Sequence, residues 1–326
     1  MGGNIKSTYK SNDTEEWLDK VFTRPLGYRW ALFFKRFHVH PNTVTVLSMI
    51  IGAGSAFFFA HGSFRTEGRY GLLCNVIAVL LLAWANVYDS ADGQLARLTG
   101  QKTRLGRILD GAAGDVWFIP SYVALVYRLS VHHGLEFAVL GIEDNAQNAF
   151  VSTIILVCVG LYSGFGCHSA QCRLADYYRQ IHLFFLREKE NCELDTFAQQ
   201  QEMYKETPWK GNFLWKIFLW LYVGYTKKQE ACTPCFQELM KKLQEKYGGA
   251  GHIPQTFCER FRNRSLPMMK WANVLTFNTR AVVLYAACLI DLPWLYFVFE
   301  IAVMSIIYRY MHVCHERFCK QFAEEL

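Results

Sequence analysis

The chain has 326 residues, of which 52% are hydrophobic and 19% are charged, and its formal net charge at pH 7 is +6. These values alone do not exclude a large soluble protein, so the distribution of the apolar residues has to decide the class. The sequence contains no repeats or low-complexity tracts, and its first forty positions lack the apolar core of a signal peptide.

The apolar residues are concentrated in six stretches, each close to the roughly 20 residues that a helix needs to cross a bilayer. These stretches are Thr43–Ala60, Gly71–Val87, Leu109–Val131, Ala149–Gly166, Thr276–Leu292 and Trp294–Met311. The pattern predicts an all-α integral membrane protein, built as a bundle of six transmembrane helices with a cytoplasmic helical insertion between helices 4 and 5.

Four parts follow from this pattern. We expect a cytoplasmic N-terminal segment with an interfacial helix at 1–42, transmembrane helices 1–4 at 43–167, the insertion at 168–270, and helices 5 and 6 with a cytoplasmic tail at 271–326. Within the insertion, aromatic residues at 215–225 favour an interfacial helix, and 237–247 has helical spacing that Gly248 ends. The insertion is interpreted first as a structural cap, with oligomer contacts or lipid recruitment as alternatives.

The placement of Lys and Arg predicts the orientation in the membrane. Seven Lys and Arg residues precede the first span, whereas the loop 132–147 has none and contains Glu136, Glu143 and Asp144. The N-terminal segment and the insertion are therefore expected in the cytoplasm. The positive net charge fits an anionic lipid surface, although the same bias explains it equally well, and we expect no nucleic-acid partner.

The second predicted span ends in a run of carboxylates and small residues. Asp89, Asp92, Gly93, Ala96 and Arg97 occupy positions i, i+3, i+4, i+7 and i+8, which share one face of a helix. Two carboxylates one turn apart suit a hard divalent cation such as Mg²⁺. The two small residues would let a ligand approach the backbone, and the guanidinium suits phosphate. Charge at the end of a membrane helix marks a functional site.

A second segment continues this logic, because Gly106 and Asp110 are four residues apart and Asp110 would complete the metal site. The combined pattern resembles the signature of the CDP-alcohol phosphotransferase superfamily, written D-x-x-D-G-x-x-A-R, eight residues, G-x-x-x-D-x-x-x-D. The positions that match are Asp89, Asp92, Gly93, Ala96, Arg97, Gly106 and Asp110.

The last carboxylate of the signature is out of register. Position 114 is Gly, and the Asp follows at 115. On a regular helix Asp115 lies roughly 140° from Asp110, whereas an Asp at 114 would lie about 40° away. A π-bulge within 111–114 could restore its direction. The catalytic-base role that the resemblance implies is carried to Asp115, with Asp110 or a metal-bound water as alternatives.

The resemblance implies transfer of a substituted phosphate from a CDP-alcohol to a second alcohol, with release of CMP. It implies two Mg²⁺ or Mn²⁺ ions held by carboxylates of the signature, here Asp89, Asp92, Asp110 and Asp115. Nucleotide-binding positions would be Asn42 and Thr45, near the start of the first span, with Gly93, Ala96, Arg97 and Gly106. We also expect a homodimer, with the active site facing the cytoplasm.

The identity of the two alcohols stays open. Arg24-Pro25 followed by Pro41-Asn42 is similar to family members that handle inositol phosphates, which favours phosphatidylinositol phosphate synthase-like chemistry with CDP-diacylglycerol as donor. Glycerol phosphate as acceptor, or choline or ethanolamine transfer to diacylglycerol, would leave the same signature. A catalytically silent lipid-binding relative is a further alternative. A transporter is less favoured, because the carboxylates lie at a membrane edge.

Other polar residues have weaker interpretations. Arg173 and Arg179 would either clamp an acceptor phosphate or anchor a helix end by snorkelling. Arg280, near the start of the fifth span, requires an anionic partner. The cysteines are expected to be reduced thiols. Cys232-Thr-Pro-Cys235 has no second pair at zinc spacing, so a metal or redox role is disfavoured.

Overall fold

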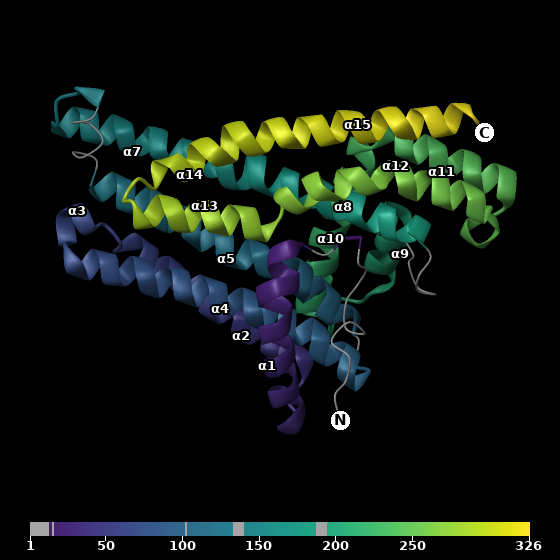
Figure 1. Ribbon diagram of the computed structural model, residues 1–326, viewed down its shortest axis with the longest axis horizontal. Helices are drawn as coiled ribbons and strands as arrows, with labels where there is room; N and C mark the ends of the chain where they lie inside the picture. The colour runs from purple at the N-terminus through teal and green to yellow at the C-terminus, as the bar shows by residue number, and fades with distance from the viewer. Residues whose placement is uncertain (1–12, 15, 102, 133–139, 187–193) are drawn as a thin grey trace. The chain divides into compact units, whose positions relative to one another are not determined.

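The computed structural model describes residues 13–14, 16–101, 103–132, 140–186 and 194–326, and the elements formed by these residues are helices (Figure 1). They group into two compact units. Of the described residues, unit 1 comprises those within 16–170 and 277–305, and unit 2 comprises those within 13–14, 171–276 and 306–326. Residues 1–12 of the predicted N-terminal segment and 133–139 of the predicted external loop lie outside the described residues.

Unit 1 is a bundle in which α2 packs against both α4 and α5, α1 packs on α4, and α5 packs on α7. Its buried core includes Phe59, Leu82, Leu125 and Tyr296. The described elements are η2 Asp19–Thr23, α1 Arg24–Arg36, α2 Pro41–Ala60, α3 Phe64–Glu67, α4 Arg69–Thr99, α5 Arg104–Val131, α7 Ala146–Leu161, η3 Tyr162–His168, α13 Phe277–Leu289, α14 Trp294–Val298 and η5 Phe299–Val303.

Local sequence signals explain where these helices begin and end. At the start of α2, His40 Nδ1 accepts a hydrogen bond from the Asn42 backbone N–H at 3.1 Å, and Pro41 occupies the first helical position. The helix thus begins two residues before the predicted first span, at a position that suits Pro because Pro has no N–H to leave unsatisfied there. Gly100 ends α4 with φ of 71°, a left-handed conformation that favours glycine.

Unit 2 contains most of the predicted insertion, and its described part is helical. The prediction that a helix ends at Tyr247 is confirmed, because Gly248 caps α11 with φ of 75°. Two helices are shared by the two units. The first residues of α8 and of α15 belong to unit 1, and the rest of each helix belongs to unit 2. The elements are α8 Ser169–Leu186, α9 Phe197–Glu206, α10 Phe213–Cys232, α11 Pro234–Tyr247, η4 Ala250–His252, α12 Gln255–Val274 and α15 Met304–Glu324.

Five helical segments of the described chain are long and apolar enough to cross a membrane: 41–60, 69–99, 146–186, 255–289 and 294–324. Five of the six predicted spans lie on them. The predicted third span, 109–131, does not reach this apolarity, because Asp110, Asp115 and Pro120 interrupt α5. The predicted count of six is therefore not reproduced by length and composition.

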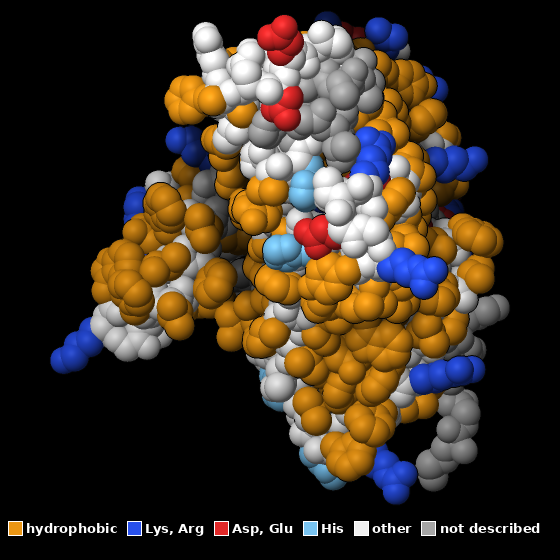
Figure 2. Space-filling view, turned by 90° about the vertical axis from the view of Figure 1, so that its left-hand side faces the viewer, with side chains coloured by type: hydrophobic (Ala, Val, Ile, Leu, Met, Phe, Trp, Pro, Cys, Tyr) orange, Lys and Arg blue, Asp and Glu red, His pale blue; other side chains and the backbone are white. Residues whose placement is uncertain are grey.

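Large apolar side chains face outward from several of these helices. Ile50 of α2 is 64% exposed, Leu80 of α4 is 62% exposed and Phe150 of α7 is 68% exposed. Figure 2 shows hydrophobic side chains covering much of the face that it draws. Contiguous apolar surface of this kind is unfavourable in water, so these surfaces and the apolar helices together identify an integral membrane protein.

Candidate active site

Three carboxylates of the predicted signature meet in unit 1. One carboxylate oxygen from each of Asp89, Asp92 and Asp110 lies within 4.8 Å of the others. We call this group the acidic cluster. The Asp92 side chain is buried, with Asp92 only 3% exposed, whereas Asp89 and Asp110 keep access to solvent. Carboxylate oxygens at this separation are the donors that hard divalent cations prefer.

The short connection between α4 and α5 brings these carboxylates together. Asp92 lies about two turns before the end of α4, and Asp110 lies about two turns after the start of α5. The connection 100–103 is closed at both ends, by Gly100 at the end of α4 and by Thr103, whose Oγ1 accepts from the Gly106 N–H at 2.9 Å. The acidic cluster therefore depends on a glycine cap and a threonine cap.

The predicted nucleotide residues near this connection behave differently from one another. Thr103 Oγ1 donates to Asn42 Oδ1 at 3.3 Å, and a Cβ added at Gly106 would lie 2.9 Å from that same oxygen. Asn42, Thr103 and Gly106 thus form one compact group. Thr45 is buried, and its hydroxyl donates to the Pro41 carbonyl of its own helix at 3.2 Å, so this hydrogen bond is a structural contact within α2.

On α4, the Arg97 guanidinium lies over Gly93. A Cβ added at Gly93 would stand 3.4 Å from Arg97 Nη2, an ordinary contact. Ala96 is partly buried on the same helix. The stripe of small residues beside a guanidinium that the sequence predicts is therefore present next to the acidic cluster.

Asp115 does not join the acidic cluster. Helix α5 runs as a regular α-helix over 104–131, without the π-bulge that could have redirected this side chain. The set of carboxylates within 4.8 Å of one another does not include Asp115. Its side chain is exposed and lines a separate cavity of about 140 Å³ with Phe118, Tyr122 and His168.

Arg280 has the anionic partner that its position required. This guanidinium and the Glu300 carboxylate form an ion pair, and both side chains are fully buried. His168 Nδ1 lies 3.2 Å from Arg280 Nη1 and 3.2 Å from the Tyr122 hydroxyl. The buried pair is thus linked through His168 and Tyr122 to the wall of the cavity that Asp115 lines.

Arg179, which belongs to unit 2, donates from Nε to Asn273 Oδ1 at 3.0 Å and from Nη2 to Thr276 Oγ1 at 3.5 Å. These contacts give it a structural role in unit 2. Arg173 is partly buried near Tyr308.

Two clusters of ionisable residues escaped the sequence analysis. Arg128 pairs with Asp291, although the two lie far apart in the chain. His315, Glu316 and Cys319 place their ligand atoms within 4.8 Å of one another in unit 2. The first had no local signal. The second had one, because histidine and cysteine four residues apart share a helix face.

The fold and the acidic cluster define a helical integral membrane protein with an oxygen-rich acidic site on an apolar helix. Residues 38–172 match the family model of CDP-alcohol phosphatidyltransferase, so this segment is similar to that family. The matched segment contains the whole acidic cluster.

An uncharacterized protein of Aquifex aeolicus (strain VF5) is similar to this chain, with 28% identity over 123 residues. The similarity covers 37% of this chain and 53% of that protein, so the chain spans about half the length of this curated relative.

Proposed function

We propose that this protein is a membrane CDP-alcohol phosphotransferase of phospholipid synthesis. The observation that carries the proposal is the convergence of Asp89, Asp92 and Asp110 within 4.8 Å, inside the segment that matches the family. The matched positions come from two helices that a short connection reverses. A solvated helix end would not require carboxylates of separate helices to meet around a buried Asp92.

The donor set of the acidic cluster fits divalent metal ions. Its oxygen ligands suit Mg²⁺ or Mn²⁺, which keep room for water and substrate phosphates. Asp89, Asp92 and Asp110 would hold these ions, and two such ions would neutralise a pyrophosphate and the departing CMP. Asp115 is left out of this ligand set, because its carboxylate lies on another side of α5.

In the proposed reaction, the acceptor hydroxyl oxygen attacks the phosphorus that carries the donor alcohol. The bond from that phosphorus to the oxygen bridging it to CMP breaks, so that CMP leaves and a phosphodiester forms. A carboxylate accepts the hydroxyl proton. Of the two candidates for this base, we favour Asp110, which belongs to the acidic cluster, over Asp115.

The chain's own groups would bind the nucleotide beside this cluster. Gly93 and Ala96 leave the α4 backbone open to approach, and Arg97 would donate to a phosphate. Asn42 and Gly106 form the opposite edge, held by Thr103. These five positions are the proposed CDP-binding surface.

For the substrates, we propose CDP-diacylglycerol as donor and an inositol phosphate as acceptor. Support comes from the Arg24-Pro25 and Pro41-Asn42 pattern. We further propose that α5 crosses the bilayer as a sixth span, that the acidic cluster lies on the cytoplasmic side, and that the protein forms a homodimer.

The test is CMP release by the purified protein in lipid, with Mg²⁺ or Mn²⁺ and CDP-diacylglycerol. Inositol phosphate, glycerol phosphate and inositol would be compared as acceptors, and CDP-choline with diacylglycerol as the alternative pair. Asp92→Asn is expected to lower CMP release by on the order of a hundredfold, because it removes a buried ligand. Asp144→Asn, in an exposed loop outside the acidic cluster, is the matched control.

Separate variants test whether Asp115 supplies the base. Asp110→Asn is expected to abolish turnover, because it removes a metal ligand as well as the favoured base, while Asp115→Asn retains most of it. A large loss with Asp115→Asn alone would return the base role to Asp115. The displaced Asp115 also favours a second candidate, a silent lipid-binding relative. That candidate would prevail if no substrate pair gave CMP and Asp92→Asn changed nothing.

A further inference from the structure

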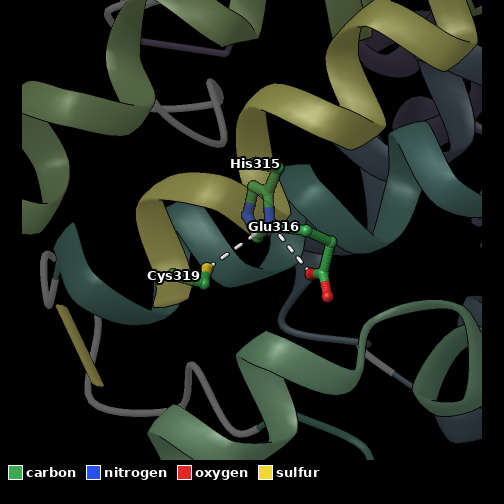
Figure 3. Close-up of side chains that lie close together, drawn as sticks. All are labelled: His315, Glu316 and Cys319. Carbon is green, nitrogen blue, oxygen red and sulfur yellow. Dashed lines mark hydrogen bonds and ion pairs between the residues drawn. The ribbon is translucent and has the colours of Figure 1, made fainter. Parts of the chain in front are cut away.

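A second cluster of metal-ligating side chains lies in unit 2, on α15. His315 and Cys319 are four residues apart and share one helix face, and Glu316 reaches them from the next position (Figure 3). His315 is 1% exposed and Cys319 is fully buried. The Cys319 Sγ lies 3.5 Å from His315 Nδ1, and the Glu316 Oε1 lies 3.8 Å from that nitrogen.

The Cys-x-x-Cys motif adjoins this cluster. Cys235 stands in the first turn of α11, where its backbone N–H donates to Glu316 Oε2 at 2.8 Å. Cys235 therefore lies next to Glu316, although its thiol is not among the ligand atoms that lie within 4.8 Å of one another. The sequence has no second Cys pair at zinc spacing, but the fold brings His315, Glu316 and Cys319 of α15 close to Cys235.

These distances are close to those between ligands of one tetrahedral ion. Bonds of about 2.0 Å to nitrogen and oxygen and about 2.3 Å to sulfur place a nitrogen and a sulfur ligand roughly 3.5 Å apart, and a nitrogen and an oxygen ligand roughly 3.3 Å apart. The 3.5 Å between His315 Nδ1 and Cys319 Sγ matches the first value, and the 3.8 Å between His315 Nδ1 and Glu316 Oε1 exceeds the other by about half an ångström. The 3.8 Å between His315 Nδ1 and Glu316 Oε1 is too long for a hydrogen bond. Glu316 Oε1 is buried and makes no hydrogen bond with the described residues. Such a carboxylate oxygen is costly to bury unless a partner or a cation neutralises it.

The chemistry of this donor set differs from that of the acidic cluster. An imidazole, a carboxylate and two thiols suit a borderline-soft ion such as Zn²⁺, whereas three carboxylates suit Mg²⁺ or Mn²⁺. Zinc binding would release the thiol protons, because the thiolate is the ligand.

We propose that unit 2 binds one Zn²⁺ ion through His315, Glu316 and Cys319, whose ligand atoms lie within 4.8 Å of one another, and that the neighbouring Cys235 turns its thiol to the ion as the fourth ligand. Four protein ligands would close the coordination sphere, as in structural zinc sites. The ion would link the start of α11 to α15. Two segments about eighty residues apart in the chain would thus be joined within unit 2.

The test is the zinc content of the full-length protein, purified without chelators in detergent and measured by inductively coupled plasma mass spectrometry. We expect about one zinc ion per chain. Cys235→Ser and Cys319→Ser should each lower the content at least tenfold. Cys314→Ser, which removes a thiol of α15 outside this cluster, is the matched control and should retain zinc.

Two further measurements keep the proposal falsifiable if a variant fails to fold. Wild-type protein reconstituted with Co²⁺ should show a thiolate-to-cobalt charge-transfer band, and a chelator should speed alkylation of Cys235. Wild-type protein without zinc, or a Cys235–Cys319 disulfide in its place, would overturn the proposal. Asp92→Asn should retain zinc whether or not it releases CMP, so this result does not depend on the proposed function.

Discussion

At the scale of single residues, the register of one carboxylate decides how complete the acidic cluster is. Asp115 lies beside a different cavity, while Gly114 stands four residues after Asp110. A Cβ added at Gly114 would meet no atom within 4 Å. An Asp at 114 would lie about 40° from Asp110 around the helix, and so would face the acidic cluster.

Gly114→Asp is therefore expected to supply the missing carboxylate. We expect Mn²⁺ affinity to rise by roughly tenfold, since carboxylate ligands suit this class of ion. Mn²⁺ binding can be followed by electron paramagnetic resonance of the purified protein, and CMP release under the same conditions reports turnover.

Gly111→Asp is the matched control, because Gly111 belongs to the same helix and a Cβ there also meets open space. It lies about 100° from Asp110, which turns the added carboxylate aside. Equal gains at both positions would show that added negative charge, and not the four-residue spacing, had caused the effect.

Residues that share one helix face could be predicted from the sequence, and residues joined by tertiary contact could not. Helical periodicity placed Asp89 and Asp92 together before any fold was known. Asp115 could not be placed, because spacing does not reveal whether α5 contains a bulge. Cys235 and His315 belong to segments about eighty residues apart, so no local pattern indicated that they meet.

At the scale of elements, one buried ion pair joins three parts of unit 1. Arg128, near the end of α5, donates to Asp291 and to the Gly62 carbonyl, the latter at 3.0 Å. Asp291 follows α13 and also accepts from Ser63 Oγ at 3.0 Å and from the Arg65 N–H at 2.9 Å. The ends of α2, α5 and α13 are therefore held at one point.

This pair predicts an acid-sensitive stability. Burial alone would raise the pKa of Asp291, but hydrogen bonds from Arg128, Arg65 and Ser63 outweigh it, so this pKa lies below its ordinary value of 3.8. The stabilisation is therefore complete above the unfolded-state pKa and is lost as pH falls through the lower, folded-state value. In detergent, the thermal unfolding temperature should stay level near neutral pH and fall below about pH 4.

Asp291→Asn should lower the free energy of unfolding at neutral pH by about 3–5 kcal/mol, because Arg128 would be left as a buried charge without its counterion. Its unfolding temperature should then lose the part of the acid dependence that Asp291 supplies. Asn tolerates the positive φ of 58° at this position, so the variant tests charge and not backbone strain. An unchanged acid profile in Asp291→Asn would contradict the assignment.

At the scale of the whole molecule, the membrane class and the helical architecture could be predicted, and the number of six spans stays a prediction. Five apolar stretches correspond to long apolar helices of the described chain. The third predicted span lies on α5, which combines Asp110 and Asp115 with a core face that includes Trp117 and Leu125. A helix that carries a polar site and also packs inside the bundle has a mean hydropathy between that of a typical span and that of a soluble helix. Hydropathy alone therefore does not decide whether α5 crosses the membrane.

Six spans and five spans predict opposite locations for the segments that follow α5. The crossing of α5 can therefore be tested. If α5 crosses, the loop at 141–145 is external and the connection 248–251 is cytoplasmic. If it does not, both locations exchange sides. We expect a reporter active only outside the cytoplasm to work at 144 and to fail at 249, and green fluorescent protein, inserted at the same positions in a bacterial host, to give the reverse pattern.

Two insertion sites provide controls whose sidedness is the same under both counts. The connection 61–63, after α2, should be external, and the connection 100–103, after α4, should be cytoplasmic. With these controls correct, an external reporter at 249 would show that α5 does not cross. The expected side of the acidic cluster would not change, because the cluster adjoins the connection 100–103, whose location is the same under both counts.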